Sequence, residues 1–384
     1  MNDALPRLEQ DDTLAQLPDD LRQTLENTLD GFCATVRLPE NSGETIRPMS
    51  RDTRGDRALG QMQQASHADA LTYEGTLGEG GMGLVRLALQ HSMGRRIAVK
   101  TLKQGIGNTE LSLRLLREAW VTGALEHPNV VPIYDVSVDD DGKPVILMKN
   151  IEGASWSALL EDEEGLRVRV GGRDRLESNL RILMQVTHAV GLAHERGVVH
   201  RDIKPDNVMI GLHGEVYLVD WGIAVSLEPD PTGRLPLLES SAPMAGTPCY
   251  MAPEMLSAAE GRRVSPRSDI YLLGAVLHEI VTGRAPHEHG DLRSVLASIL
   301  LSMPKLPNET DAELRAVIER ALDANPDARY RTAKDFRLAI ETFLVHRDSN
   351  QVTDDAWVRL RELERDLQTR DAQDNERVRK AHMA

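Results

Sequence analysis

The chain contains very little cysteine and no excess of basic residues. Its only cysteines are Cys33 and Cys249, too few for a disulfide framework or a cysteine-based zinc site, and this scarcity suits a reducing compartment. The 60 acidic residues outnumber the 45 basic ones and give a formal net charge of −15. Nucleic acids and anionic membranes both attract basic surfaces. We therefore expect no nucleic-acid partner.

Long apolar segments are also missing. No window reaches the ~20 consecutive apolar residues that a membrane-spanning helix needs, and the N-terminal residues lack the basic start and apolar run of a secretory signal. No internal repeat is visible. We therefore expect a cytoplasmic protein with no membrane span in this chain.

The most informative segment that is present reads His200-Arg201-Asp202-Ile203-Lys204-Pro205-Asp206-Asn207, and Asp220-Trp221-Gly222 follows thirteen residues after Asn207. Asp202 can accept a proton from a hydroxyl group, while Asn207 and Asp220 carry the oxygen atoms that hard cations prefer. Transfer of a phosphoryl group from a metal–nucleotide complex needs these parts. A lone Asp or Asn is more often a turn or cap residue. Five matching positions within eight residues outweigh that interpretation.

A glycine-rich segment lies upstream and reads Leu77-Gly78-Glu79-Gly80-Gly81-Met82-Gly83-Leu84-Val85. Glycines let backbone amides close over phosphates. Alone the pattern is weak, because it also opens dinucleotide-binding folds and marks flexible hairpins. Its position strengthens it, since the apolar run that ends in Lys100 follows. A lysine that binds phosphates needs a fixed partner, and Glu118 on the next predicted helix is the candidate.

Together these motifs resemble those of the eukaryotic-type protein kinases, and Gly-Glu-Gly-Gly-Met-Gly is the form typical of bacterial serine/threonine kinases. The resemblance covers about residues 73–345 and implies an α+β, bilobal protein kinase fold. Its N-lobe, residues 73–150, is expected to be a small antiparallel sheet with one helix. Its C-lobe, residues 151–345, is expected to be larger and mainly helical.

The resemblance also implies the roles of single residues. Asp202 is the expected catalytic base, Lys204 neutralises charge on the transferred phosphate, and Lys100, held by Glu118, binds the α and β phosphates of ATP. The implied metal ligands, for Mg²⁺ or alternatively Mn²⁺, are Asn207 and Asp220. The other nucleotide-binding residues are Leu77, Gly78, Gly80, Gly83, Val85, Ala98, Met148, Ile151 and Met209. The implied structural residues are His200, Arg201, Glu254, Asp269 and Arg329, with Glu254 paired to Arg329 and Asp269 bracing the catalytic loop.

The run Gly246-Thr247-Pro248-Cys249-Tyr250-Met251-Ala252-Pro253-Glu254 resembles the end of a kinase activation segment. Thr247 is expected to contact Asp202 and Lys204. Upstream of it, Ser241 is the predicted main autophosphorylation site and Ser240 the second. We interpret Cys249 as a small packed residue, with a redox role as the alternative.

Hydrophobic periodicity predicts the elements around these motifs. Strands are predicted at 97–100, 129–134 and 145–148, helices at 109–125, 176–196, 268–282, 311–324 and 332–346, and an exposed loop insertion at 161–174. Residues 1–70 are predicted to be an acidic, polar, mostly disordered extension. Residues 350–384 are predicted to be a charged helix that packs on the lobe or serves as a linker, with Trp357, Leu360, Leu363 and Leu367 on one face.

The predicted function is a serine/threonine protein kinase that acts on protein hydroxyls and forms a homodimer for autophosphorylation in trans. Lys204-Pro205 favours Ser or Thr over Tyr as the acceptor. A pseudokinase that only binds nucleotide or partners is disfavoured, because Lys100, Asp202 and Asp220 are all present. A small-molecule phosphotransferase of the same fold is disfavoured by the segment that ends in Ala252-Pro253-Glu254.

Overall fold

The computed structural model describes residues 71–79, 83–103, 109–238, 244–256, 263–288, 291–302 and 304–383. The predicted extension 1–70 lies outside the described residues, as do Gly80, Ser240 and Ser241. The chain divides into two compact units between Arg337 and Leu338. Each unit is described by itself.

A five-stranded antiparallel sheet in the order β1-β2-β3-β5-β4 forms the N-terminal part of the first unit. The strands are β1 (Leu71–Glu79), β2 (Gly83–Gln90), β3 (Arg95–Leu102), β4 (Ile133–Val138) and β5 (Pro144–Lys149). Between β4 and β5 the backbone N–H groups of Asp141 and Lys143 donate to the Asp139 carboxylate at 3.1 and 2.8 Å. This local bonding explains why a tight turn forms there.

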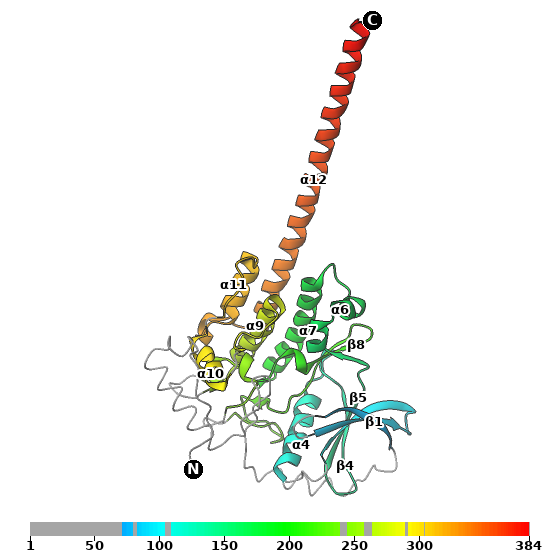
Figure 1. Cartoon of the computed structure of the whole chain (residues 1–384). Coiled ribbons are helices and arrows are strands. Elements are labelled where there is room, and N and C mark those ends of the chain that lie inside the picture. The colour runs from blue at the N-terminus through cyan, green and yellow to red at the C-terminus, as the bar shows by residue number, and fades with distance from the viewer. Residues whose placement is uncertain are drawn as a thin grey trace. The chain divides into compact units, whose positions relative to one another are not determined.

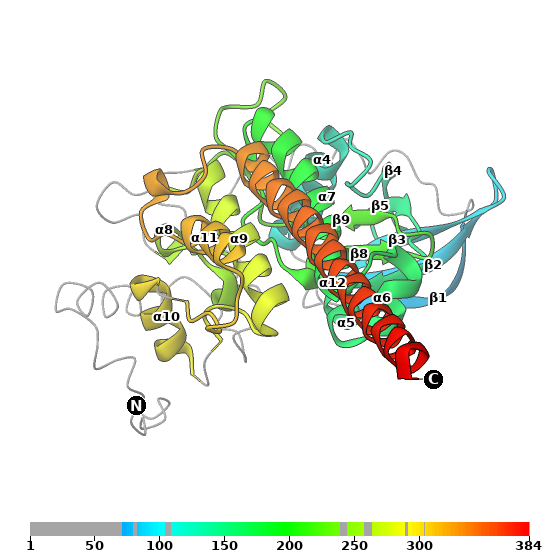
Figure 2. The same cartoon turned by 90° about the horizontal axis from the view of Figure 1, so that it is seen from above.

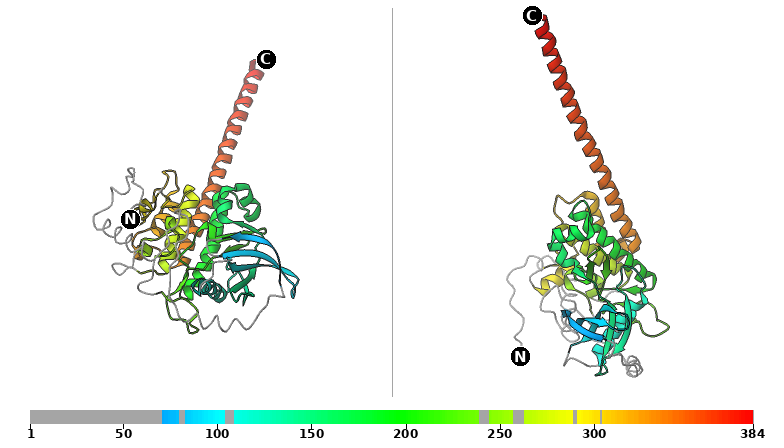
Figure 3. Two further views of the ribbon diagram at one scale, coloured as in Figure 1. Left: turned by 60° about the horizontal axis from the view of Figure 1, so that its bottom comes forward. Right: turned by 90° about the vertical axis from the view of Figure 1, so that its right-hand side faces the viewer.

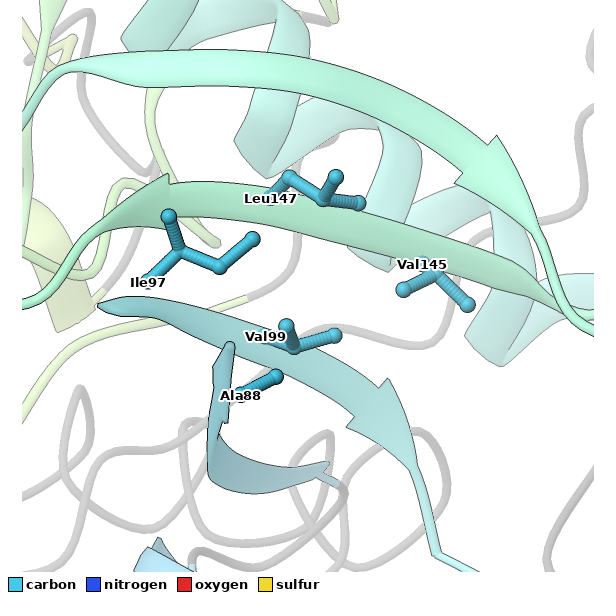
Figure 4. Close-up of a cluster of buried hydrophobic side chains, with 5 residues drawn as sticks. All are labelled: Ala88, Ile97, Val99, Val145 and Leu147. Carbon is cyan, nitrogen blue, oxygen red and sulfur yellow. The ribbon is translucent and has the colours of Figure 1, made fainter. Parts of the chain in front are cut away.

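Alternation along β3 divides its side chains between two faces of the sheet. Ile97 and Val99 join one buried cluster, whose other members are Ala88, Val145 and Leu147 (Figure 4). Leu102 lies on the opposite face and packs with Leu115, Ala119 and Ile146. Leu115 and Ala119 belong to α4 (Thr109–Ala124), which contacts β3, β4 and β5 (Figure 1). Lys100, two residues before Leu102, therefore lies on the face that carries α4.

The remainder of the first unit is mainly helical. Its helices are α5 (Trp156–Glu161), α6 (Glu163–Val170), α7 (Arg175–Glu195), α8 (Pro253–Leu256), α9 (Pro266–Thr282), α10 (Leu292–Leu301) and α11 (Ala312–Ala321). Its short strands are β6 (Gly153–Ser155), β7 (Val198–Val199), β8 (Val208–Gly211), β9 (Val216–Leu218) and β10 (Val225–Ser226). Helix α9 contacts both α7 and α11 (Figures 1 and 2). The predicted α+β architecture, a small sheet with one helix followed by a larger helical part, is confirmed.

Helix α9 forms the centre of this helical part. Every residue from Ser268 to His278 is buried. A capping box between Ser265 and Ser268 begins the helix, and Gly283, whose φ is 76°, ends it in the left-handed conformation that glycine adopts at low cost. A helix buried all round has no polar face to expose, which agrees with the nearly continuous apolar sequence.

Helix α12 (Ala333–Met383) is one uninterrupted helix (Figures 1 and 3). The sequence predicts two helices, 332–346 and 350–384, and the structure joins them. No proline or glycine occurs between residues 333 and 383, so nothing in the sequence stops the helix. Among the helices in the described part of the chain, none combines the length and the apolar character that crossing a membrane requires.

Two local predictions were wrong. The expected loop insertion at 161–174 contains α6, whose first turn is capped by Asp162, which accepts from the Gly165 N–H at 2.9 Å, and whose Leu166 is buried. Leu166 is the one fully buried apolar residue in this charged segment, and the sequence pattern did not distinguish it from a loop residue. The strand expected at 129–134 begins only at Ile133. The Asn129 side chain instead donates to the carbonyl of Val216 at 2.9 Å, which ties this segment to β9.

Candidate active site

The carboxylate of Asp202 lies in a buried hydrogen-bond network between β7 and β8. The Thr247 hydroxyl donates to Asp202 Oδ1 at 2.6 Å, and Lys204 Nζ donates to the same hydroxyl at 2.8 Å. Lys204 Nζ also lies 4.0 Å from Asp202 Oδ2. All three side chains are buried. The structure thus brings Thr247, 45 residues further along the chain, into contact with both residues that the sequence names as its partners.

Asn207 and Asp220 lie at the same end of the antiparallel pair formed by β8 and β9, one just before β8 and the other two residues after β9. The Val219 N–H donates to the carbonyl of Asn207 at 2.9 Å and closes this end of the pair. The Asn207 amide nitrogen donates to the carbonyl of Asp202 at 2.8 Å and to Asp202 Oδ2 at 2.9 Å. These two bonds fix the amide, so that its oxygen is the atom presented to a cation.

The backbone at Asp220 is left-handed, with φ of 59°. Aspartate tolerates this conformation better than most residues. Asp220 Oδ1 accepts from the Gly222 N–H at 3.3 Å. Trp221, which follows, is buried with its ring centroid 4.4 Å from that of His200. This packing ties the Asp220 segment to the loop that carries Asp202.

Lys100 and Glu118 form an ion pair with Nζ and Oε1 2.5 Å apart, and both side chains are less than a fifth exposed, at 18% and 13%. Lys100 lies opposite Val85 on β2 and Ile146 on β5. A side chain at Gly83 would bring its Cβ to 3.2 Å from the Thr101 carbonyl oxygen and 3.5 Å from Lys100 Cε. The tight approach is to the strand backbone at Thr101, while the approach to Lys100 is an ordinary contact.

The candidate nucleotide-binding residues divide between two sheets. Directly paired residues of adjacent strands share a face, so the pairs Val85–Lys100 and Ala98–Met148 place these side chains on one face of the large sheet. Leu77 and Gly78 lie on β1, where Gly78 pairs with Val85, and Ile151 follows β5. Met209 lies on the separate sheet β6-β8-β9. Gly80 lies outside the described residues.

Asp269, at the start of α9, braces the loop that precedes Asp202. Its carboxylate accepts from the backbone N–H groups of His200 and Arg201 at 2.8 and 2.9 Å, and His194 Nε2 lies 2.9 Å from its Oδ2. Burial by itself raises the pKa of Asp269. His194, His200 and the Arg201 N–H together lower this pKa by more than burial raises it, so the net shift is downward. Asp269 thus stays ionised inside the protein.

The bracing by Asp269 holds an unusual backbone. Arg201 has φ of 72°, which costs a non-glycine residue about 1–2 kcal/mol. Burial lowers the pKa of the Arg201 guanidinium to about 10, which leaves it cationic at neutral pH. Burial also lowers the pKa of His200, whose Nδ1 accepts from the Asp202 N–H at 3.2 Å. A neutral His200 therefore orients the Asp202 backbone.

Glu254 and Arg329 form a fully buried ion pair. Arg329 Nη1 donates to Glu254 Oε1 at 2.7 Å and Nη2 to Oε2 at 2.9 Å. Arg329 also donates to the carbonyls of Asp323 and Arg267 at 2.7 and 2.9 Å, and the Ser268 hydroxyl donates to Glu254 at 2.7 Å. Both side chains are 0% exposed. The pair ties α8, which follows Thr247, to η5 (Pro326–Ala328) and α9.

The structure adds contacts that sequence reasoning missed. His194, which the sequence places only on a helix face, bonds to Asp269. The Arg234 guanidinium carbon lies 5.8 Å from the ring centroid of Trp120 on α4, two residues beyond Glu118. Arg234 lies between Gly222 and Gly246, so this segment touches the helix that carries Glu118. No spacing in the sequence signals either contact.

Cys249 is buried, and burial raises the pKa of its thiol to about 12. The thiolate, which is the reactive form, is therefore scarce at neutral pH. This favours the interpretation of Cys249 as a packed residue over a redox role.

A buried carboxyl near Cys249 gives a pH-dependent prediction. Tyr250 donates to Glu279 Oε2 at 2.7 Å. Burial, aided by the carboxylates of Asp206 and Glu288, raises the pKa of Glu279 to about 7 from an ordinary value of 4.5. Between pH 4.5 and about 7 the Glu279 carboxyl is protonated in the folded state and ionised in the unfolded state. Its contribution to the free energy of unfolding is therefore fully present below pH 4.5 and is lost as the pH rises through about 7.

Glu279→Gln keeps an acceptor for Tyr250 but cannot ionise. The free energy of unfolding of wild type should decrease between about pH 5 and 8, when Glu279 ionises. In the Glu279→Gln variant this decrease, measured by urea denaturation, should be smaller by about 1–3 kcal/mol. The exposed Glu319 provides the control, and Glu319→Gln should retain the wild-type pH dependence. A Glu279→Gln profile parallel to wild type would contradict the assignment.

Comparison with known proteins agrees with this geometry. Residues 71–337 match the model of the protein kinase domain. The chain therefore belongs to the protein kinase family, and within it to the eukaryotic-type serine/threonine kinases of bacteria. The resemblance seen in the sequence is confirmed. Such domains use ATP and a divalent metal ion.

Named relatives include the serine/threonine-protein kinase PknD of Chlamydia trachomatis serovar L2b, 34% identical over 292 residues, which are 70% of this chain and 31% of PknD. The Chlamydia caviae PknD is 33% identical over 287 residues, 70% of this chain and 30% of its own. A probable serine/threonine-protein kinase of Streptomyces coelicolor, SCO3848, is 33% identical over 277 residues, 70% of this chain and 39% of its own. The chain thus spans about a third of the length of these relatives.

Proposed function

We propose that this protein is a serine/threonine protein kinase that transfers the γ-phosphoryl group of ATP to serine and threonine hydroxyls of proteins, its own among them. The observation that carries the proposal is the buried network of Asp202, Lys204 and Thr247. It holds a carboxylate and a cation side by side, which is the pairing that deprotonation of a hydroxyl and transfer of a phosphoryl group require.

In this mechanism Asp202 orients the acceptor hydroxyl and takes its proton. The Thr247 hydrogen bond fixes the carboxylate, and Lys204 neutralises charge on the transferred phosphoryl group. Lys100, held by Glu118, binds the phosphates of the nucleotide. The apolar face with Val85, Ala98 and Met148 would cover the adenine.

The ordered amide oxygen of Asn207 and the carboxylate of Asp220 fit a hard cation, and we assign them to Mg²⁺, with Mn²⁺ as the alternative. Magnesium in kinases is held by a few protein oxygens together with substrate phosphates and water. When bound, the ion neutralises charge on the phosphates. A side chain of Asn207 clamped by two bonds to Asp202 links the metal site to the catalytic base.

The acceptor is inferred to be Ser or Thr of a protein. Lys204 lies where tyrosine kinases generally lack a lysine, and the segment Gly246–Glu254 resembles one that protein kinases have and small-molecule phosphotransferases generally lack. Lys100, Asp202 and Asp220 are all retained, which favours turnover over a scaffold role. The test is transfer of labelled γ-phosphate from ATP and Mg²⁺ to a generic basic protein, followed by analysis of the phosphorylated amino acids. Label on tyrosine alone, or on no protein, would refute the assignment.

Autophosphorylation is assigned to Ser241, with Ser240 as the second site, and is expected to occur in trans within a homodimer. Arg201 is the cation expected to receive the phosphate. The variant Ser240→Ala with Ser241→Ala should lose most of the incorporated phosphate and part of its activity. Mass spectrometry of the segment locates the sites, and unchanged phosphate content would remove both from consideration.

Lys100 is expected to be essential for productive nucleotide binding. Lys100→Met should lower kcat/KM by about a hundredfold or more, because methionine carries no charge to bind the phosphates or to pair with Glu118. Glu118→Gln should have a smaller effect, since a neutral amide oxygen still accepts the lysine hydrogen bond. The control is Lys143→Met in the turn between β4 and β5, where the lysine Nζ lies 4.0 Å from the exposed Asp141 carboxylate. This variant should stay within about twofold of wild type. Equal activity of Lys100→Met and the control would exclude the role.

A further inference from the structure

Exposed apolar side chains form a line along α12. Leu338, Val345, Val352, Leu360 and Leu363 are exposed by 41%, 58%, 67%, 44% and 59%. With the exposed Ala356 they make up what we call the α12 stripe, defined as Leu338, Val345, Val352, Ala356, Leu360 and Leu363. Large apolar side chains gathered along one line of a surface mark an interaction site more often than scattered ones do.

The spacing of the stripe is that of a coiled-coil seam. Leu338, Val345 and Val352 are seven residues apart, and the next three members follow at intervals of four, four and three. The step from Val352 to Leu363 is thus eleven residues, four longer than a heptad, and it shifts the heptad register at that point. With 3.6 residues per turn, these intervals return to the same side of the helix. Ile340 and Phe343, which are buried, project from a different side. The stripe therefore lies on a different side of α12 from Ile340 and Phe343.

Polar residues within the seam do not oppose its burial. Ser349 lies midway between Val345 and Val352, and its hydroxyl donates to the carbonyl of Val345 at 2.9 Å. Thr353 similarly donates to the carbonyl of Ser349 at 2.9 Å. Both hydroxyls are satisfied within the helix, so neither of these two donors is left unpaired when the seam is buried against a partner.

The charges beside the seam indicate which partner fits. Arg359 immediately precedes Leu360, and Glu364 immediately follows Leu363. In the register of the second half of the stripe, with Leu360 and Leu363 at the core positions a and d, these residues take positions g and e. Leu338, Val345 and Val352 follow the register of the first half, which precedes the shift. In a parallel pair in register, Arg359 of one helix faces Glu364 of the other, and two-fold symmetry repeats the contact.

An anionic membrane fits less well as the partner. Helices that lie on such membranes carry a basic polar face. Here the carboxylates of Asp355, Glu362 and Glu364 lie among the arginines of the same stretch. The charge pattern is complementary to itself and not to a uniformly negative surface.

We propose that the α12 stripe is a parallel coiled-coil interface through which two copies of this chain associate. The parallel arrangement places two kinase domains at the same end of the coiled coil. If the proposed kinase function holds, on which this consequence rests, each domain meets the activation segment of the other at a high effective concentration. Association then favours autophosphorylation in trans.

Sedimentation equilibrium of the full chain tests the association. We expect a reversible monomer–dimer equilibrium that Leu363→Glu weakens by roughly a hundredfold or more, since two buried leucines are lost per dimer. The matched control is Val358→Glu, which introduces the same charge at a valine exposed by 52% on another side of the same helix. It should leave the dimer within about threefold of wild type. Circular dichroism should show the same helix content in all three proteins.

The orientation is tested by exchanging charges. Arg359→Glu and Glu364→Arg should each weaken the dimer by about five- to tenfold, because each converts both attractive contacts into repulsive ones. The double variant Arg359→Glu with Glu364→Arg should recover wild-type association. Three results would overturn the proposal. The double variant could fail to recover, the chain could remain monomeric up to about 100 µM, or Leu363→Glu and Val358→Glu could weaken the dimer equally. Anionic vesicles that bind α12 of a monomer would also overturn it.

The two proposals fail separately. Sedimentation needs no catalysis, and the Asp202→Asn variant should dimerise like wild type. If the chain is an active kinase, Leu363→Glu should slow self-phosphorylation by about tenfold at concentrations below the wild-type Kd, while phosphorylation of an external protein stays unchanged. A dimer without activity would refute the kinase function alone, and an active monomer would refute the interface alone.

Discussion

Asp202→Asn is expected to lower kcat for phosphoryl transfer by about 10³-fold or more, the largest effect on activity of any single change considered for this protein. Asparagine cannot take the proton of the acceptor hydroxyl. Its oxygen can still accept the hydrogen bond from Thr247, so the fold around it should survive. In the wild type the Asn207 amide nitrogen donates to Asp202 Oδ2 at 2.9 Å. In the variant the NH₂ group of the new asparagine would face this nitrogen instead of an acceptor.

Steady-state transfer of labelled phosphate gives kcat, and calorimetry with nucleotide and Mg²⁺ gives binding. The variant should bind nucleotide within about tenfold of wild type, which separates loss of chemistry from loss of the site. Asp206→Asn serves as the matched control, because Asp206 carries the same group in the same loop but is exposed. We expect its kcat within about threefold of wild type. An Asp202→Asn enzyme that keeps a tenth of the wild-type kcat would remove Asp202 as the catalytic base.

Arg329→Met is expected to lower the free energy of unfolding by about 3–5 kcal/mol, the largest effect on stability. The substitution keeps much of the side-chain volume but leaves the Glu254 carboxyl buried without the guanidinium that pairs with it. It also removes the donors that now satisfy the carbonyls of Asp323 and Arg267. An unpaired buried carboxylate is costly because water cannot replace the lost partner.

Urea and thermal denaturation measure this loss. The control is Arg267→Met, which removes an ion pair with Asp327, a residue whose side chain is 82% exposed, and which should cost less than about 1 kcal/mol. Combining Arg329→Met with Glu254→Leu should recover part of the stability, since a buried ion pair replaced as a whole costs less than one broken in half. If Arg329→Met and Arg267→Met are equally stable, the buried pair does not hold α8 as inferred.

The sequence motifs were informative where the required residues are close together in the chain. Asp202, Lys204 and Asn207 lie within six residues of one another, so their order and spacing could be recognised directly. The resemblance that they support predicted the bilobal α+β architecture and the family, both of which are confirmed. It also named the pairs Lys100–Glu118 and Glu254–Arg329, which the structure brings into contact.

Sequence reasoning failed where a single apolar residue or a distant partner decides the structure. Helix α6 follows from one buried leucine, Leu166, in a charged segment that resembles a loop. The bond between His194 and Asp269 joins residues 75 positions apart and follows no motif. The Arg234–Trp120 contact joins two segments that come together only in the folded domain.

Helix α12 also combines a feature that the sequence predicted with one that only the structure revealed. The sequence indicated an apolar face with Trp357, Leu360, Leu363 and Leu367, and left open whether the helix packs on the lobe. The structure makes the helix continuous from Ala333 and shows Leu338, Val345 and Val352 exposed at heptad spacing, so the line of exposed apolar side chains extends far upstream of the expected face. Trp357 lies beside the seam and not within it.

The sequence by itself determined the family, the fold class and the catalytic motifs, because a reaction on ATP restricts the residue types and spacings that a loop of eight residues can have. Only the tertiary structure decided how that loop is held. Its backbone is braced by Asp269 from α9, the Asp202 carboxylate by Thr247, and the backbone carbonyl of Asn207 by the Val219 N–H beside the β8–β9 pair. Such contacts form between residues far apart in the chain, where burial and hydrogen-bond geometry, and not sequence spacing, select the partner.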